Sequence, residues 1–147
     1  IPQSTAIAIQ EAIYAEDPAA LQTQLRKLLL QSVSHNDTTD EIFYHGLVLG
    51  LCAMLDNRYY VRSNRGSGEG RFDIQLMPRN DKLPGILIEL KAGKECSEGA
   101  LERLAQTALE QIDARHYDTE MTAHGVTDIL KYGVAFCGKK VSIAFAK

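Results

Sequence analysis

Apolar residues in the first third of the chain recur at the spacing of amphipathic helices. Ser4 or Thr5 is a suitable cap for a short first helix. Asp17 and Pro18 then predict the start of a second helix, because Asp is a favoured N-cap and a proline in the first turn loses no hydrogen bond. Leucines at positions 21, 25, 28 and 29 continue this second helix up to Val33.

A third helix is predicted after a polar break at 34–37. Thr38 and Glu41 stand three residues apart, the spacing of a capping box, in which two side chains satisfy backbone N–H groups of the first turn. The helix is expected to stop near Asp56 and Asn57. Its expected apolar side consists of Phe43, Leu47, Leu51 and Leu55.

The hydrophobic period changes to two in the middle of the chain. Residues 59–61 are β-prone, 71–76 alternate strictly between polar and apolar, and 86–91 are apolar enough for a strand buried on both faces. Two final strands, 132–137 and 141–145, are expected to form a hairpin. The sequence therefore predicts a sheet after the N-terminal helices.

A long helix is predicted between the central and final strands, starting at Ser97 and Glu98. Its apolar stripe consists of Leu101, Leu104, Ala105, Ala108 and Ile112. Helices, three strands, a helix and two strands in this order indicate a mixed α/β layer structure.

The composition is that of an ordinary globular protein, with 45% hydrophobic and 24% charged residues among 147. No apolar run approaches the roughly 18 residues of a membrane span, so no membrane partner is expected. Three cysteines without zinc or disulfide spacing favour a reducing, cytoplasmic compartment. The chain opens with Ile1 rather than Met, which suggests a piece of a longer protein.

Charge is distributed unevenly along the chain. The net charge of −3 does not by itself indicate nucleic-acid binding. Residues 58–94, however, hold eight bases against four acids, a local charge of +4. Chance clustering of bases in loops and strand ends is the alternative explanation.

Three chemically active side chains fall on the two central strands. Alternation places Glu89 and Lys91 on one face of their strand, and Asp73 opposite the apolar positions of the preceding strand. If the strands are neighbours, the two carboxylates converge. Such a pair suits Mg²⁺, which acidifies a bound water, while a lysine can orient that water or neutralise developing charge. A structural Glu–Lys pair on a half-exposed strand is the alternative.

The wider sequence resembles the PD-(D/E)XK nuclease superfamily from about residue 40 to 145. The resemblance is carried by Gly-x-Gly-Arg-Phe-Asp at 68–73, Ile-Glu-Leu-Lys at 88–91, the helix 108–112 and Tyr-Gly-Val-Ala-Phe at 132–136. More narrowly, the chain resembles the nuclease-like C-terminal domain of bacterial proteins that begin with an AAA-ATPase-like domain. The proline that precedes the first Asp in the family is replaced by Phe72. The resemblance implies an α/β fold with a restriction-endonuclease-like mixed β-sheet core, flanked by helices and extended by N-terminal helices.

The resemblance also implies roles for individual residues. Asp73 and Glu89 are expected to bind Mg²⁺ or Mn²⁺, and Lys91 is expected to serve the attacking water. Glu41 is the candidate for a further metal-binding carboxylate, with its capping-box role as an equal alternative. Gln111 is implied as a further catalytic residue, and a buried glutamine bonded to backbone is the alternative.

Four side chains are candidates for substrate binding. Arg65 and Arg71 border the glycine-rich turn, where they can contact a phosphate backbone; the glycines can equally mark a tight turn alone. Tyr117 resembles a tyrosine that some family members place near the metal or DNA. His45 lies one turn after Glu41 on the same side of the predicted helix, and a hydrogen-bonded structural histidine is the alternative.

The functional hypothesis is therefore metal-dependent hydrolysis of phosphodiester bonds in nucleic acid, with DNA favoured. The alternative is a catalytically inactive module of the same fold that binds nucleic acid or protein. Residues 1–37 are interpreted as a helical extension or a bridge to an upstream domain, and 38–147 as the nuclease-like domain. An ATPase domain in the same full-length chain is the expected partner, and a homodimer stays open.

Overall fold

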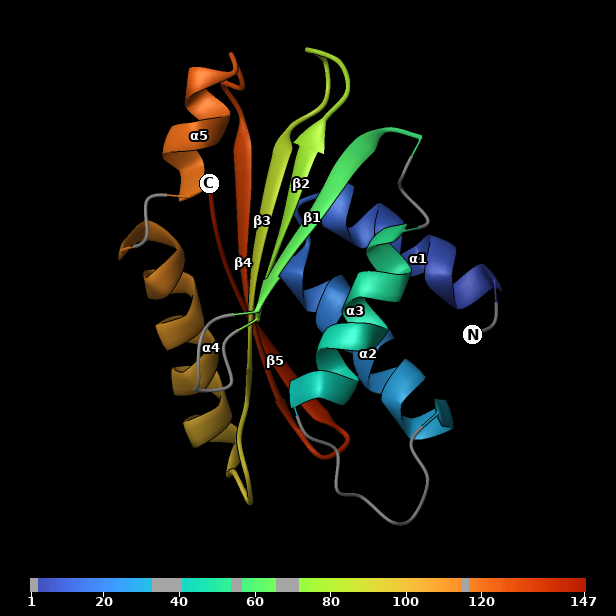
Figure 1. The fold of residues 1–147 in the computed structure, drawn as a ribbon. Helices are drawn as coiled ribbons and strands as arrows, with labels where there is room; N and C mark the ends of the chain where they lie inside the picture. The colour runs from blue at the N-terminus through green and yellow to red at the C-terminus, as the bar shows by residue number, and fades with distance from the viewer. Residues whose placement is uncertain (1–2, 33–40, 54–56, 66–71, 115–116) are drawn as a thin grey trace.

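The computed structural model describes residues 3–32, 41–53, 57–65, 72–114 and 117–147. Helices cover both faces of one sheet (Figure 1). One layer of helices consists of α1 (Gln3–Tyr14), α2 (Pro18–Ser32) and α3 (Glu41–Ala53). The other consists of α4 (Glu98–Ala114) and α5 (Tyr117–Ala123). Among the described helices, none is long and apolar enough to cross a membrane.

The sheet has five strands in the sequential order β1-β2-β3-β4-β5. They are β1 (Tyr59–Arg65), β2 (Phe72–Pro78), β3 (Gly85–Ala92), β4 (Ile129–Cys137) and β5 (Lys140–Ala146). Neighbouring strands are antiparallel except β3 and β4, which are parallel. A parallel pair needs a crossover connection, and α4 and α5 supply it on one face of the sheet. The predicted mixed α/β sheet flanked by helices is confirmed.

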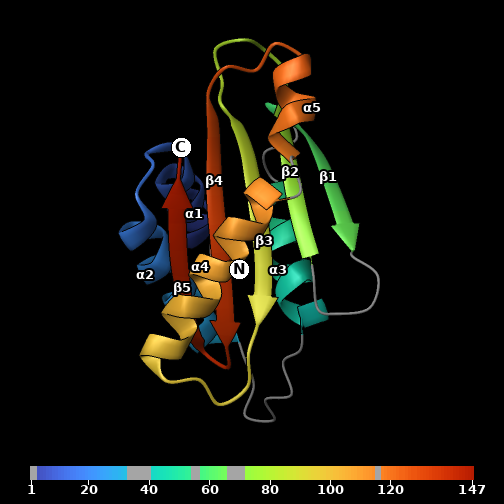
Figure 2. The same ribbon diagram turned by 90° about the vertical axis from the view of Figure 1, so that its left-hand side faces the viewer.

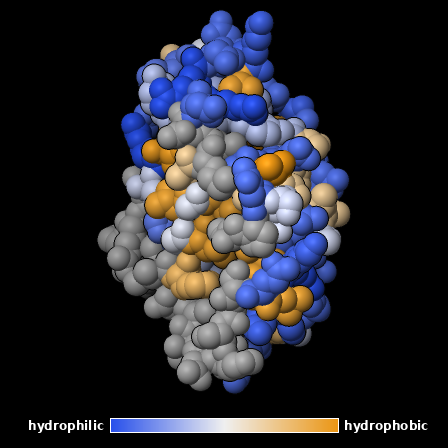
Figure 3. Space-filling view, turned by 90° about the vertical axis from the view of Figure 1, so that its right-hand side faces the viewer, coloured by the Kyte–Doolittle hydropathy of each residue, from blue (hydrophilic) through white to orange (hydrophobic). Residues whose placement is uncertain are grey.

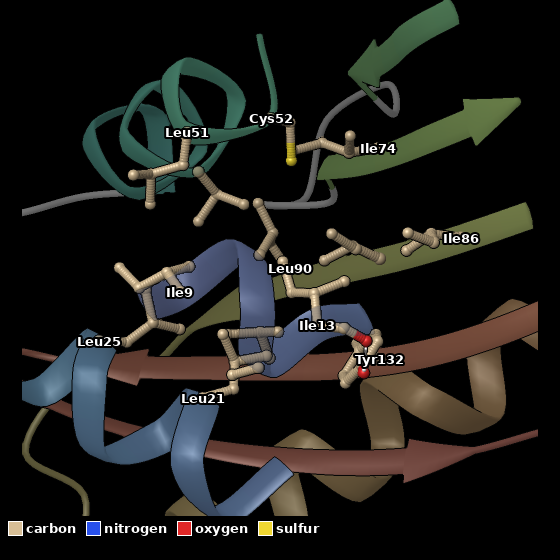
Figure 4. Packing of buried hydrophobic residues seen from close by; sticks show 14 of the residues in the cluster. Ile9, Ile13, Leu21, Leu25, Leu51, Cys52, Ile74, Ile86, Leu90 and Tyr132 are labelled. Atoms are coloured by element: carbon tan, nitrogen blue, oxygen red, sulfur yellow. Dashed lines mark hydrogen bonds between the residues drawn. The ribbon is translucent and has the colours of Figure 1, made fainter. Parts of the chain in front are cut away.

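The two N-terminal helices belong to the main hydrophobic core. The predicted cap at Asp17 is confirmed, because its Oδ1 accepts a hydrogen bond from the Ala20 N–H at 3.0 Å. Figure 4 shows side chains of α1 and α2 against those of the sheet, with Ile13 beside Tyr132. The Tyr132 hydroxyl donates to the Ile13 carbonyl at 2.7 Å. Helices α1 and α2 are therefore packed onto the sheet. Figure 3 looks onto the outer side of this helix layer and shows apolar side chains near its centre.

The third helix buries only part of the side that the sequence predicts. Leu51 is buried as predicted, but Phe43 is 38% exposed and Leu47 is only partly buried, whereas the unpredicted Tyr44 and Val48 are buried. Amphipathic spacing alone does not decide which side of α3 is buried, because apolar residues occupy several of its sides. Tyr44 is buried because its ring stacks on Phe136 at 4.4 Å between centroids and its hydroxyl donates to the Gly138 carbonyl at 2.7 Å. The predicted Leu55 and the cap residue Thr38 lie outside the described residues.

The long helix α4 begins and packs much as predicted. Ser97 caps it, since its Oγ accepts a hydrogen bond from the Ala100 N–H at 3.1 Å. Leu104 is partly exposed, and Leu109 is buried in its place. The short helix α5 was not predicted, because seven residues are too few to show a helical period. Figure 2 looks onto the sheet face that α4 and α5 cover, which we call the α4 face.

Side chains of α2 hydrogen-bond to backbone groups of the edge strand β5. The Ile143 N–H donates to Oε1 of Gln22 at 3.1 Å, and Arg26 Nε donates to the Val141 carbonyl at 2.9 Å. These side chains occupy backbone groups that would otherwise face outward from a sheet edge. The hairpin turn into β5 has Gly138 at φ +59°, a conformation that glycine adopts without steric cost.

Candidate metal and nucleic-acid site

Two acidic side chains, Asp73 and Glu89, lie directly opposite each other on the antiparallel strands β2 and β3. We call them the acidic pair. Directly opposite residues share a face of the sheet, with Cβ atoms about 4.5–5.5 Å apart. Asp73 is 3% exposed and Glu89 is 0% exposed. The two strands are neighbours, so the two carboxylates converge as the sequence analysis expected for that case.

Strand alternation sets which face carries the acidic pair. Their strand neighbours Ile74 and Ile88 are buried in the core with α1 to α3. Asp73 and Glu89 therefore point to the opposite side, the α4 face. Lys91 follows Glu89 by two residues on β3, so it lies on the same face, and it is less buried than Glu89. The structure thus brings two carboxylates and one ammonium to one face of two adjacent strands.

Gly133 on β4 lets α4 approach the sheet beside this site. It is the register partner of Glu89 on the other side of β3. A Cβ atom at Gly133 would lie 2.6 Å from the backbone N of Leu109 and closer still to the carbonyl oxygen of Ala105. The backbone of α4 therefore rests directly on β4 next to Glu89, and only glycine fits at this contact.

Gln111 lies on α4 less than one turn beyond that contact. α4 also contacts β3, over which its C-terminal part lies in Figure 2. The Oε1 atom of Gln111 is buried and accepts no hydrogen bond from the described residues. Buried amide oxygens are nearly always satisfied, so this atom is suited to a water or ligand group that only binding supplies. Among the described residues, no backbone N–H donates to this oxygen, as the structural alternative for Gln111 would require.

Four of the predicted site residues can be placed by backbone or sequence alone. Glu41 is the first residue of α3, Arg65 ends β1 and Tyr117 begins α5, and their side chains lie outside the described residues. Arg71 lies wholly outside them. Tyr117 follows the end of α4 as expected. Arg65 pairs with Phe72, the residue before Asp73, so its backbone is close to the acidic pair.

His45 does not join the acidic pair. It lies on α3, on the other face of the sheet, where its Nε2 and the Ser63 Oγ form a hydrogen bond. Ser63 pairs with Ile74, which confirms that this contact is on the core side. This bond fits the alternative of a hydrogen-bonded structural histidine, and a role of His45 in substrate binding stays a prediction. Spacing from Glu41 predicts the place of His45 on the helix but not which face of the sheet the helix covers.

The sequence reasoning missed three lysines that the parallel pairing brings to the end of β3. β3 and β4 end on the same side, and Lys94, Lys139 and Lys140 follow these ends. Lys94 and Lys140 are exposed, and Lys140 Nζ donates to the Cys96 carbonyl in the β3–α4 loop at 3.5 Å. We call these three residues the lysine end. The signal was present as two adjacent lysines in a turn, but nothing in the sequence linked that turn to Lys91.

Another unpredicted cluster fixes the connection between α4 and α5. Lys131 on β4 donates to Asp113 at 2.7 Å and to Asp118 at 3.5 Å. The hydrogen bond to Asp113, aided by the negative charge of both carboxylates, raises the pKa of Lys131 against the opposing effect of its partial burial. Because Asp118 follows Tyr117, the first residue of α5, this cluster holds the start of α5 against the sheet.

A cavity of about 670 Å³ lies further along β2, and neither Asp73 nor Glu89 lines it. Gln75 and Met77, which follow Asp73 on the same face, line it together with residues of β1 and α5. Arg62 and Glu120 form an ion pair between β1 and α5 at 3.1 Å. The cavity therefore begins two residues beyond Asp73 on β2, between β1 and α5, and is much larger than a metal ion.

The donor chemistry of the acidic pair fits a hard divalent cation. Mg²⁺ commonly takes one or two protein carboxylates and keeps water or phosphate oxygens as its other ligands. Buried carboxylates are costly unless they are paired or coordinate a metal. Within the described part of the chain, no group of three or more His, Cys, Asp or Glu side chains is arranged to hold a metal. Asp73 and Glu89 would hold the ion, and Glu41, whose side chain lies outside the described residues, stays the candidate for a third carboxylate.

Comparison with known families agrees with this geometry. A family model described as the PD-(D/E)XK nuclease superfamily matches residues 39–146. The chain belongs to the PD-(D/E)XK nuclease superfamily. Nucleases of this superfamily generally use divalent metal ions. A search of curated proteins gave no match.

Proposed function

We propose that this PD-(D/E)XK chain hydrolyses phosphodiester bonds of nucleic acid, with DNA as the expected substrate. The observation that carries the proposal is the acidic pair, Asp73 opposite Glu89 on one sheet face, with Lys91 two residues along. Two carboxylates on one face of adjacent strands supply the oxygen ligands that a hard divalent cation takes, which supports this proposal.

Each side chain has a distinct task in this proposal. Asp73 and Glu89 hold Mg²⁺ or Mn²⁺ through their carboxylate oxygens. When bound, the ion lowers the pKa of a coordinated water and stabilises negative charge on the phosphoryl group. Lys91 orients the attacking water and offsets the charge that develops. Gln111, with its buried amide oxygen, is proposed to position a water or substrate group next to the acidic pair.

Substrate binding is assigned to cationic groups around the acidic pair. Nucleic-acid affinity depends on phosphate contacts made by Lys and Arg. We propose that Arg65, Arg71 and Tyr117 contact the substrate, as the family resemblance implies, and that the lysine end extends this surface. The local cations offset the overall charge of −3.

The test is cleavage of linear, circular, branched and single-stranded nucleic acid with Mn²⁺, Mg²⁺ or EDTA. Glu89→Gln and Lys91→Ala should each lower the rate by at least about 100-fold, the typical effect of removing one catalytic group. Glu102→Gln, an exposed carboxylate on α4, and Lys82→Ala, an exposed lysine after β2, should leave it unchanged. Cutting that survives EDTA or Glu89→Gln would contradict the proposal.

The second candidate is a noncatalytic module that binds nucleic acid or protein. The acidic net charge favours it, because a nuclease of this size usually gains from a basic surface. A folded parent chain that neither cuts nor binds Mn²⁺ by calorimetry would select this function. Metal binding without cutting would instead leave the acidic pair as a metal site and direct attention to the choice of substrate.

The proposed link to an AAA-ATPase-like domain rests on the narrower sequence resemblance. Helices α1 and α2 would then lie between that domain and the sheet. Reading the full open reading frame tests this directly, since Walker-type motifs upstream of the present Ile1 are expected.

A further inference from the structure

Two cysteine side chains meet where β3 and β4 end. Cys96 lies in the loop between β3 and α4, and Cys137 is the last residue of β4. The Cys96 N–H donates to the Cys137 Sγ at 3.1 Å. The Cys96 thiol itself donates to the Lys94 carbonyl at 3.7 Å, and both cysteine side chains pack under the first turns of α4. They are 41 residues apart in sequence, so only the fold brings them together.

The two thiols differ in their access to solvent. Cys96 is partly exposed, whereas Cys137 is 8% exposed. Burial and the neighbouring Cys137 side chain raise the pKa of the Cys96 thiol, and the Lys140 ammonium opposes that rise. Because Cys96 is the more exposed of the two thiols, a small oxidant reaches it first, and its backbone N–H already contacts the Cys137 Sγ.

We propose that Cys96 and Cys137 form a reversible intramolecular disulfide when the protein meets a peroxide. The Cys96 thiolate attacks one peroxide oxygen, the O–O bond breaks, and Cys96 becomes a sulfenic acid as hydroxide leaves and takes up a proton. The Cys137 thiol then attacks the Cys96 sulfur, the S–O bond breaks, and water leaves. In sum, two thiols and one hydrogen peroxide give one disulfide and two waters.

The disulfide would join the β3–α4 loop to β4, the parallel neighbour of the strand that carries Glu89 and Lys91. Lys91 pairs with Ala135 on β4, and Cys137 follows Ala135 by two residues on the same face. Cys96 immediately precedes Ser97, the cap of α4. The bond would therefore fix the start of α4 to the end of β4, beside Lys91 and the lysine end. This chemistry requires neither metal nor nucleic acid, so it is independent of the proposed nuclease activity.

Cys52 provides an internal control. It is 1% exposed on α3, on the other side of the sheet, and burial raises the pKa of its thiol to about 12. It should stay reduced under conditions that oxidise the pair.

The experiment treats the native chain at low concentration with an equimolar amount of hydrogen peroxide, then alkylates free thiols and maps the peptides without reduction. We expect a monomer about 2 Da lighter than the reduced chain, with Cys96 joined to Cys137 and Cys52 alkylated after unfolding. Dithiothreitol should restore three alkylatable thiols. A Cys52→Ala chain should form the same bond.

Two variants separate the steps. Cys137→Ser should stop at a Cys96 sulfenic acid, which dimedone traps, and Cys96→Ser should leave Cys137 reduced. If Cys137→Ser does not fold, the Cys96→Ser chain and the parent peptide map still decide the matter. The proposal is overturned if the folded parent monomer keeps both thiols free, or if Cys96 proceeds to sulfinic acid with Cys137 still reduced.

Discussion

The contact between Gly133 and α4 makes a sharp prediction about a single methyl group. In Gly133→Ala, the new Cβ would lie 2.6 Å from the Leu109 backbone N, where ordinary contacts begin at 3.4 Å. The helix backbone would have to retreat by at least about 0.8 Å, the difference between these two distances, because the Ala105 carbonyl oxygen lies closer still. Neither neighbouring atom belongs to a flexible side chain that could rotate away, so the whole helix or the strand must move.

We expect Gly133→Ala to lower the free energy of unfolding by about 1–3 kcal/mol, the usual cost of overpacking. For a chain of this size the midpoint of thermal unfolding would fall by roughly 3–12 °C. The matched control is Gly50→Ala on α3, where an added Cβ has nothing within 4 Å. Alanine is the better helix former, so this variant should gain about 0.5–1 kcal/mol.

The measurement is urea unfolding of both variants and the parent, followed by circular dichroism. The same chemical change should thus shift the unfolding midpoint in opposite directions at the two positions. A Gly133→Ala chain as stable as the parent would refute the close contact of α4 with β4. Cleavage by Gly133→Ala should also fall, because a displaced α4 moves Gln111 relative to the acidic pair.

Three further predictions concern other parts of the chain. Deleting residues 1–37 should leave a chain that shows no cooperative unfolding by circular dichroism. The deletion removes six buried leucine and isoleucine side chains of α1 and α2, and their burial, at about 1.5–3 kcal/mol each, matches the whole stability of a small domain. Replacing Lys139 and Lys140 by Ala should reduce the slope of log affinity against log salt by about 2, whereas Lys82→Ala should not, as measured by fluorescence anisotropy with labelled DNA and Glu89→Gln protein. The raised pKa of Lys131 means that the folded chain holds the Lys131 proton more tightly than the unfolded chain does. The stability that the charged Lys131 contributes is therefore complete below the unfolded pKa of about 10.4, and it is lost as the pH rises through the folded pKa. Urea unfolding between about pH 8 and 11 should show a shallower loss of stability in Lys131→Met than in the parent.

The acidic pair could be predicted from sequence because local rules were sufficient to place it. Strict alternation assigned Asp73 and Glu89 to faces of their strands, and a short connection made those strands neighbours. The same reasoning was only partly right for α3: Leu51 is buried as predicted, but the burial of Tyr44 depends on its contacts with Phe136 and Gly138, which the spacing of apolar residues does not show.

Contacts between distant segments were not visible in the sequence. Nothing local to Gly133 indicates that a helix backbone lies against it, and Lys139 and Lys140 have no pattern that connects them to Lys91. The face occupied by His45 likewise depended on which side of the sheet α3 covers. The contacts of Gly133 and of the two lysines follow from the parallel β3–β4 pairing and the crossover that it requires, whereas the place of His45 follows from the packing of α3.

Because Gln22 and Arg26 bond to backbone groups of β5, the two edges of the sheet differ in their ability to pair with an added strand. A partner that adds a strand to a sheet needs outward-facing backbone groups. On the β5 side, α2 already occupies such groups at Val141 and Ile143. The opposite edge is β1, next to the strand that carries Asp73. Any strand added by a second protein or a second copy would therefore extend the sheet from β1, and it would lie one strand away from the acidic pair.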